Sequence, residues 1–274
     1  KGYGDGTFRP KNQITRGETA KILSNVSRNI WEESIEEPRE EIPKHEEFIK
    51  VIDELPNPKD IIEIISLDKV NTEKARQIFT NLTEEEKSNI PKDRIEKLIN
   101  IESKIESLKT PIKSKTKATI DQAQNWARNK GAHERFIDIA PFYWYYGEIT
   151  DINPEILYVQ AAKETNFGRY TGAVLPEMNN WAGIKILDPI GDSTYDHEIF
   201  DTPQDGVRAH FNHMGIYCGV EPIEEPHPRW YKTSTASWAG KVVYVEDLGG
   251  RWAPSPDYGI SIIRDYLRNL YNTP

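Results

Sequence analysis

The chain has 274 residues, of which 29% are charged and 37% hydrophobic, and its formal net charge is −9. This length suffices for one good hydrophobic core with smaller appendages, so we expect two domains or more. The negative charge argues against nucleic acid as a partner. The sequence has no run of 18 apolar residues and no polybasic patch, so we expect no membrane contact. The single cysteine, Cys218, excludes a disulfide within the chain.

Residues 1–30 combine a glycine-rich loop, GYGDGTFRP, with a short amphipathic stretch from Thr15 to Val26. Thr15, with Glu18 three residues later, forms a capping box that marks the start of a helix. The segment resembles the second half of an S-layer homology motif. That resemblance implies anchoring to secondary cell-wall polysaccharide, usually by three repeats together. Because half a repeat cannot bury its own core, we expect a piece of a longer surface protein that no longer binds the polymer alone.

Residues 31–47 are rich in glutamate and are interrupted by Pro38 and Pro43. Like charges and prolines resist compaction, so this segment is expected to be an acidic linker. A second, lysine-rich linker is expected at residues 109–116.

Between the linkers, residues 48–108 place apolar side chains three and four positions apart in three segments, which predicts a three-helix bundle. The segment resembles the small spacer bundles of bacterial surface proteins at three dipeptides: Leu55-Pro56, Ala75-Arg76 and Leu82-Thr83. It shows no acid pair, metal cluster or aromatic platform, so we expect a structural role.

The stretch NPEILYVQAAKETNFGRY, residues 153–170, predicts a helix that carries Glu164 near its end. Asn153 suits the N-cap, Pro154 the first turn, and Gly168 the end of the helix. At helical spacing Glu164 shares a face with Leu157, Gln160 and Ala161. Apolar surroundings and the negative end of the helix dipole should raise the pKa of the Glu164 carboxyl group. A raised pKa suits a general acid that works near neutral pH.

Two more motifs follow in the chain: NNWAGIK, residues 179–185, and GGRWAPSPDYG, residues 249–259. The first suits a tight turn, and the flat rings of the second suit the apolar faces of sugars. With QAAKETNFG they resemble, in order and spacing, the glucosaminidase domain of glycoside hydrolase family 73, found in bacterial cell-wall hydrolases. The resemblance covers residues 117–274. Lys163 and Phe167 depart from the usual pattern of the family, and neither is the acid.

The resemblance implies a mainly α chain with a lysozyme-like α+β catalytic domain, in which a small β-hairpin lobe forms one wall of a groove. Residues 191–200, which alternate loosely and end in a turn, are the candidate for that hairpin. The family resemblance also implies hydrolysis of the β-1,4 bond after N-acetylglucosamine in peptidoglycan glycan strands, with Glu164 as general acid and no cofactor. A secreted protein at the cell surface or in the cell wall is expected.

The second catalytic group stays open between the hairpin acids Asp196 and Glu198 and the phenol of Tyr258, which can stabilise charge while the substrate acetamide acts as nucleophile. We expect Tyr258 to matter more than either acid. The expected substrate-binding residues are Gln160, Tyr170, Asn180, Trp181, Trp238 and Trp252.

Two other kinds of site are weighed and disfavoured. His210 and His213 lie one helical turn apart but lack a convincing third ligand, so no metal is expected. Nothing in the sequence activates Cys218 as a peptidase nucleophile. Two alternatives to the glucosaminidase remain: another lysozyme-type enzyme, either a muramidase or a lytic transglycosylase, and a glycan-binding module without activity.

Overall fold

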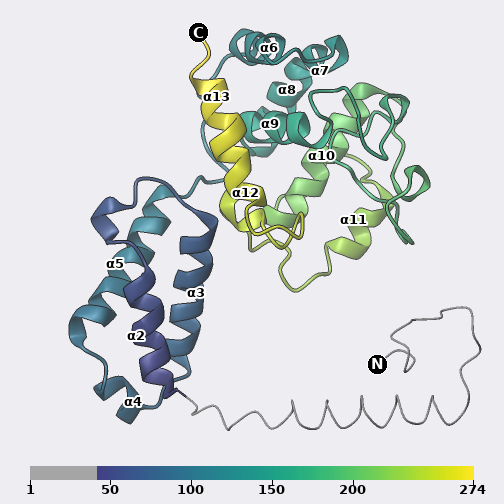
Figure 1. The fold of residues 1–274 in the computed structure, drawn as a ribbon. Coiled ribbons are helices and arrows are strands. Elements are labelled where there is room, and N and C mark those ends of the chain that lie inside the picture. The colour runs from purple at the N-terminus through teal and green to yellow at the C-terminus, as the bar shows by residue number, and fades with distance from the viewer. Residues whose placement is uncertain (1–41) are drawn as a thin grey trace, which may run out of the picture. The chain divides into compact units, whose positions relative to one another are not determined.

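A computed structural model describes residues 42–274 of the chain (Figure 1). The predicted S-layer homology half-motif and most of the acidic linker lie outside the described residues. Over residues 42–274 the structure is mainly helical, as expected, and contains three isolated β-bridges but no longer strand. No helix in this part of the chain has both the length and the apolar character needed to cross a membrane.

The N-terminal part of the described chain contains the three helices predicted from the periodicity. The helices are α2 (Lys44–Glu54), α3 (Ser66–Thr80) and α5 (Lys92–Leu108), with a 3-10 turn at Pro58–Asp60 and a short additional helix, α4 (Glu84–Ser88). The extra helix starts at a capping box in which the Thr83 hydroxyl accepts from the Glu86 amide and the Glu86 carboxylate accepts from the Thr83 amide. We call α2 to α5 the spacer helices.

The buried cluster of the spacer helices also includes a residue from outside these helices. Phe48, Ile52 and Leu98 are fully buried in their common cluster, and Ile260, from the far end of the chain, belongs to the same cluster. Ser66 donates a hydrogen bond to the Asp257 carboxylate close by. Packing therefore continues across the predicted linker, and His45–Pro274 form one unit.

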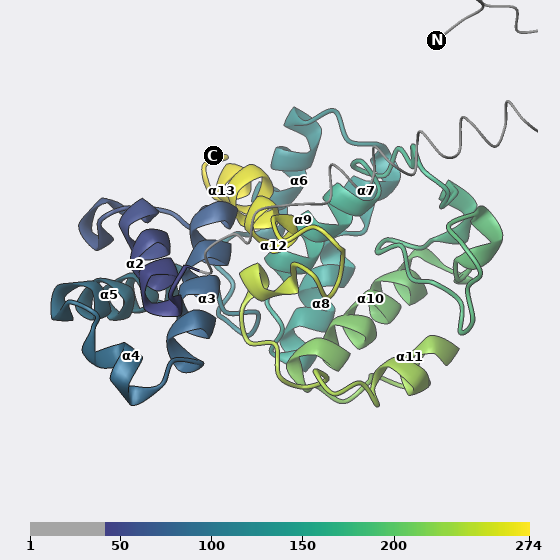
Figure 2. The same cartoon turned by 60° about the horizontal axis from the view of Figure 1, so that its bottom comes forward.

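The C-terminal part is built from short helices around one buried helix. They are α6 (Ile120–Asn129), α7 (Glu134–Asp138), α8 (Ala140–Thr150), α9 (Pro154–Glu164), α10 (Pro203–Cys218), α11 (Pro228–Thr233), α12 (Tyr258–Ser261), a π-helix (Ile262–Leu267), α13 (Arg268–Tyr271), and the 3-10 turns Pro176–Met178, Thr194–Asp196 and Val245–Leu248. Helix α9 packs against α8 and the π-helix, and Figures 1 and 2 show it among the surrounding helices. Every residue from Pro154 to Ala162 is buried.

Helix α9 begins as predicted, because the Asn153 side chain accepts a hydrogen bond from the Glu155 amide at 2.8 Å. It ends at Glu164, four residues before Gly168. The next turn is closed by left-handed residues, Asn166, Phe167 and Gly168, and the Thr165 hydroxyl accepts from the Gly168 amide at 2.9 Å. Because the helix ends at Glu164, this residue is exposed, whereas the residues from Pro154 to Ala162 are buried.

The run of aromatic residues in α8 divides between core and surface. Tyr143 and Tyr146 are buried and Tyr145 is exposed, because neighbouring side chains on a helix point in different directions. Tyr143 points toward α10, where its hydroxyl lies 2.9 Å from His210 Nδ1.

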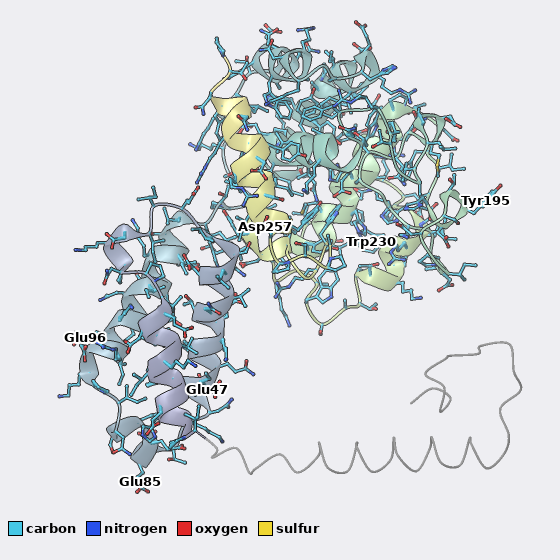
Figure 3. The ribbon with its side chains drawn as sticks, in the orientation of Figure 1. Glu47, Glu85, Glu96, Tyr195, Trp230 and Asp257 are labelled. Atoms are coloured by element: carbon cyan, nitrogen blue, oxygen red, sulfur yellow. The ribbon has the colours of Figure 1, made fainter. Side chains whose placement is uncertain are left out.

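The β-hairpin predicted at residues 191–200 is not confirmed. Instead, the chain forms one antiparallel bridge between Lys185 and His197. The Asp196 carboxylate accepts from the amides of residues 190, 191 and 193 and from the Ser193 hydroxyl, which curls the segment into a turn. Tyr195 points away from this loop in Figure 3 and is 91% exposed.

We predict that Ile260→Ala lowers the free energy of unfolding by about 2–5 kcal/mol, because it leaves a cavity in the cluster of the spacer helices. Urea unfolding followed by tryptophan fluorescence measures the change. The control is Ile62→Ala, whose side chain is 81% exposed and should change stability little. Equal effects of the two variants would contradict the shared core.

Candidate active site

Glu164 is the last residue of α9 and its side chain is exposed. Desolvation by the dense protein around it raises the pKa of its carboxyl group. Hydrogen bonds from Tyr258 and Trp252 and the positive charge of Lys163 oppose that rise. Because the side chain is exposed, a ligand can reach this carboxyl group, whose pKa is raised.

Tyr258 is the residue that holds this acid. It is buried at the first position of α12, and its hydroxyl donates to Glu164 Oε1. The next residue, Gly259, lies close to the preceding 3-10 turn, since a Cβ at this position would be 1.9 Å from the Val245 carbonyl oxygen. Only glycine lets α12 pack this tightly on the preceding 3-10 turn.

Behind Tyr258 a line of buried polar side chains runs into the core. Gln160 Nε2 donates to the Tyr258 oxygen at 2.9 Å, and Gln160 Oε1 lies 3.1 Å from His210 Nε2. His210 Nδ1 in turn meets the hydroxyl of Tyr143. Burial lowers the pKa of His210 to about 3, so the ring is neutral at any working pH. Gln160 is fully buried, and both the oxygen and the NH₂ group of its amide have hydrogen-bond partners, so the side chain does not face a ligand in this structure.

The predicted aromatic residues of the last third of the chain gather beside the acid. Trp252 hydrogen-bonds Glu164 and lies over α10, with its ring centroid 5.6 Å from His210 and 5.3 Å from Tyr217. Trp238 stacks on Tyr217, with ring centroids 4.6 Å apart. Both tryptophans are only partly buried, so part of this aromatic surface is open.

The loop formed by NNWAGIK borders the second oxygen of the acid. A Cβ at Gly183, whose φ is +61°, would lie 3.7 Å from Glu164 Oε2. Asn180 is fully buried, where its amide donates to the carbonyl oxygens of Ile184 and Glu198 at 2.8 and 3.0 Å. The loop therefore places a residue without a side chain next to the acid.

Two other predicted binding residues lie inside the protein. Trp181 is fully buried and donates to the Pro203 carbonyl oxygen at 3.0 Å. Tyr170 is buried against it, with ring centroids 5.6 Å apart. In this arrangement both residues pack inside the protein beneath the surface of the NNWAGIK loop.

The two acids of the predicted hairpin differ in environment. Asp196 is buried, and the hydrogen bonds it accepts, first from the Ser193 side chain and backbone, lower the pKa of its carboxyl group. Glu198 is half-buried, and burial raises the pKa of its carboxyl group. Asp196 holds the loop, whereas the Glu198 carboxyl group is partly open to solvent.

The histidines and the cysteine do not assemble a second reactive centre. His213 faces His227, with ring centroids 5.2 Å apart, while His210 faces Gln160. Across residues 42–274 no group of three or more histidine, cysteine or acidic side chains could hold a metal ion. Burial raises the pKa of Cys218 to about 11, which keeps its thiol protonated.

Sequence reasoning missed the contact between Gln160 and His210. The spacing of four residues between Gln160 and Glu164 does indicate one helical face. His210, however, lies 50 positions away. A metal site with His213 was the role weighed for it in the sequence, and that role was disfavoured. Pairing across the core leaves no periodic signal in the sequence.

Two parts of the chain match models of known protein families. Residues 140–270 match the model of the glucosaminidase family, described as mannosyl-glycoprotein endo-beta-N-acetylglucosaminidase, and residues 1–20 match that of the S-layer homology domain. No curated protein and no solved structure matches the chain. The glucosaminidase match contains every candidate catalytic residue, from Glu164 to Tyr258. Residues 140–270 therefore belong to the glucosaminidase family, and the chain carries a glycoside hydrolase domain of the endo-β-N-acetylglucosaminidase type.

Proposed function

We propose that the chain hydrolyses the β-1,4 bond that follows N-acetylglucosamine in peptidoglycan, with Glu164 as general acid. The observation that carries this proposal is the environment of that carboxyl group. Its side chain is exposed, desolvation by the surrounding protein raises its pKa, and one of its oxygens accepts a hydrogen bond from Tyr258. The partial S-layer homology match supports a bacterial wall as the source of the glycan. The full-length protein would then be retained at the cell surface through secondary cell-wall polysaccharide.

In the proposed reaction the proton sits on Glu164 Oε2, because Oε1 accepts from Tyr258. Oε2 borders Gly183, where no side chain blocks the approach of a glycosidic oxygen. Glu164 gives this proton to the leaving oxygen as the sugar develops oxocarbenium character. The aromatic faces of Trp252 and Trp238 suit the sugar rings on either side of the bond.

We assign the nucleophile to the acetamide of the substrate, with Tyr258 next to the reacting carbon. Asp196 already accepts four hydrogen bonds within its own loop, which makes it a poor base. Glu198, half-buried with a raised pKa, is the alternative second carboxylate.

The first test is Glu164→Gln, which keeps the shape of the side chain but has no acidic proton. We expect the rate of release of reducing ends from purified cell walls to fall by about 10²-fold to 10⁴-fold. The melting temperature should stay unchanged, because the side chain is exposed. Glu148→Gln, an exposed acid on α8, is the matched control. Full activity of Glu164→Gln would refute the proposed acid.

The second test compares Asp196→Asn, Glu198→Gln and Tyr258→Phe in the same assay. If the acetamide is the nucleophile, Tyr258→Phe should lose more activity than either acid variant. Asp196→Asn should instead lower the melting temperature, because an amide cannot accept all four hydrogen bonds. A Glu198→Gln variant as inactive as Glu164→Gln would make Glu198 the second catalytic group.

Product analysis separates the proposed activity from its rivals. After borohydride reduction and mass spectrometry, a glucosaminidase leaves reduced N-acetylglucosamine at the new ends. A muramidase leaves reduced N-acetylmuramic acid, and a lytic transglycosylase leaves an anhydro end. Wall binding without any new ends would indicate a module without activity.

The last test is removal of metal ions. Wall hydrolysis should continue in EDTA, because His213 and His227 lack a third ligand in the described part of the chain. Activity that is lost in EDTA and restored by zinc would contradict this.

A further inference from the structure

The contacts behind Glu164 form an unbroken chain of hydrogen bonds through four side chains. It runs from Tyr143 in α8 to His210 in α10, then to Gln160 in α9, and ends at Tyr258 in α12. Tyr143, Gln160 and His210 are each fully buried. Water therefore does not compete for these bonds, and each donor must be matched by an acceptor.

The direction of the bonds in this chain follows from the chemistry of its members. Neutral His210 carries one ring hydrogen. If Tyr143 donates to Nδ1, the hydrogen lies on Nε2 and is donated to Gln160 Oε1. The Gln160 amide is then fixed with its NH₂ group toward the Tyr258 oxygen. Tyr258 has only one hydrogen, which it gives to Glu164.

The opposite direction is unfavourable at both ends. His210 would donate from Nδ1 to Tyr143, whose hydroxyl has no other partner among the described residues, so its hydrogen would be buried without an acceptor. The Gln160 amide would be flipped and would accept from Tyr258. The lone pairs of Tyr258 would then face Glu164 Oε1, which carries no hydrogen when the proton is on Oε2, so no hydrogen would lie between the two oxygens.

We propose that His210, held as its Nε2–H tautomer by Tyr143, is a positioning residue that acts through Gln160 to aim the Tyr258 hydroxyl at Glu164 Oε1. This inference rests on the proposed role of Glu164. This chain of hydrogen bonds strengthens the bond from Tyr258, because each donated hydrogen polarises the group that accepts it. It also reserves Oε2 for the proton that is transferred.

Breaking the chain changes the pH dependence in a defined direction. Lys163, Trp252, Tyr258 and Tyr266 are the titratable or polar groups that interact with Glu164. The bond from Tyr258 lowers the pKa of Glu164, so weakening that bond raises it. A general acid is active while protonated, so the alkaline limb of kcat/KM moves to higher pH.

The test is a double-mutant cycle between Gln160→Met and Tyr258→Phe. Gln160→Met keeps the side-chain length and breaks the chain in the middle. We expect it to lower kcat by a few-fold to about tenfold, a part of what general acid catalysis supplies. KM should stay nearly unchanged, and the alkaline limb should shift upward. In the Tyr258→Phe background it should have no further effect, because it acts only through Tyr258.

The matched control is Asn212→Leu, another buried polar residue of α10. Its amide bonds to the backbone of Ile223, away from Glu164. It should lower the melting temperature yet leave the alkaline limb in place. If Gln160→Met does not fold, Tyr143→Phe takes its place in the cycle. Additive effects, or an unmoved limb, would overturn the proposal.

A second measurement needs no activity. Nitrogen-15 NMR of labelled histidine in the wild-type protein should show His210 with the hydrogen on Nε2 and no titration between about pH 5 and 8. A hydrogen on Nδ1, or titration in that range, would overturn the tautomer lock. Full activity of Glu164→Gln would instead remove the proposed function while leaving this spectrum unchanged.

Discussion

The hydrogen bond from Tyr258 to Glu164 connects the start of α12 to the end of α9 across 94 positions of the sequence, and the candidate site is built around it. Glu164 lies at the end of the buried helix α9, and one helical turn earlier Gln160 is completely enclosed. The polypeptide thus passes from the protein interior at Gln160 to the surface at Glu164 within one helical turn. An acid placed there combines access for a polymer with a protein environment that disfavours its charge.

Three consecutive residues at the start of α12 connect this bond to the rest of the chain. Tyr258 holds the acid, Gly259 lets the helix lie against the Val245 carbonyl, and Ile260 enters the core of the spacer helices. Asp257, just before them, accepts from Ser66 in α3. The position of the phenol is therefore linked to packing that extends well beyond the catalytic domain.

The parts of this architecture that follow from local chemistry were predictable. The cap at Asn153 and the helix carrying Glu164 both rest on signals within a few residues. The loop at residues 191–200 was not, because the hydrogen bonds of one carboxylate, Asp196, outweigh its strand-like alternation. Burial of Asn180 and Trp181 was hidden as well, since a polar loop motif gives no sign of which side chains turn inward.

His210 shows most clearly where sequence reasoning ends. Two histidines one turn apart suggest a metal, yet in the structure they diverge, one toward Gln160 and the other toward His227. Deep burial favours neutral imidazole, and a neutral ring with one hydrogen can donate on one side and accept on the other. A ring that accepts on one side and donates on the other makes all the hydrogen bonds in the series point the same way, from Tyr143 toward Glu164. A buried histidine beside an acid can thus serve catalysis without binding a metal or carrying a charge.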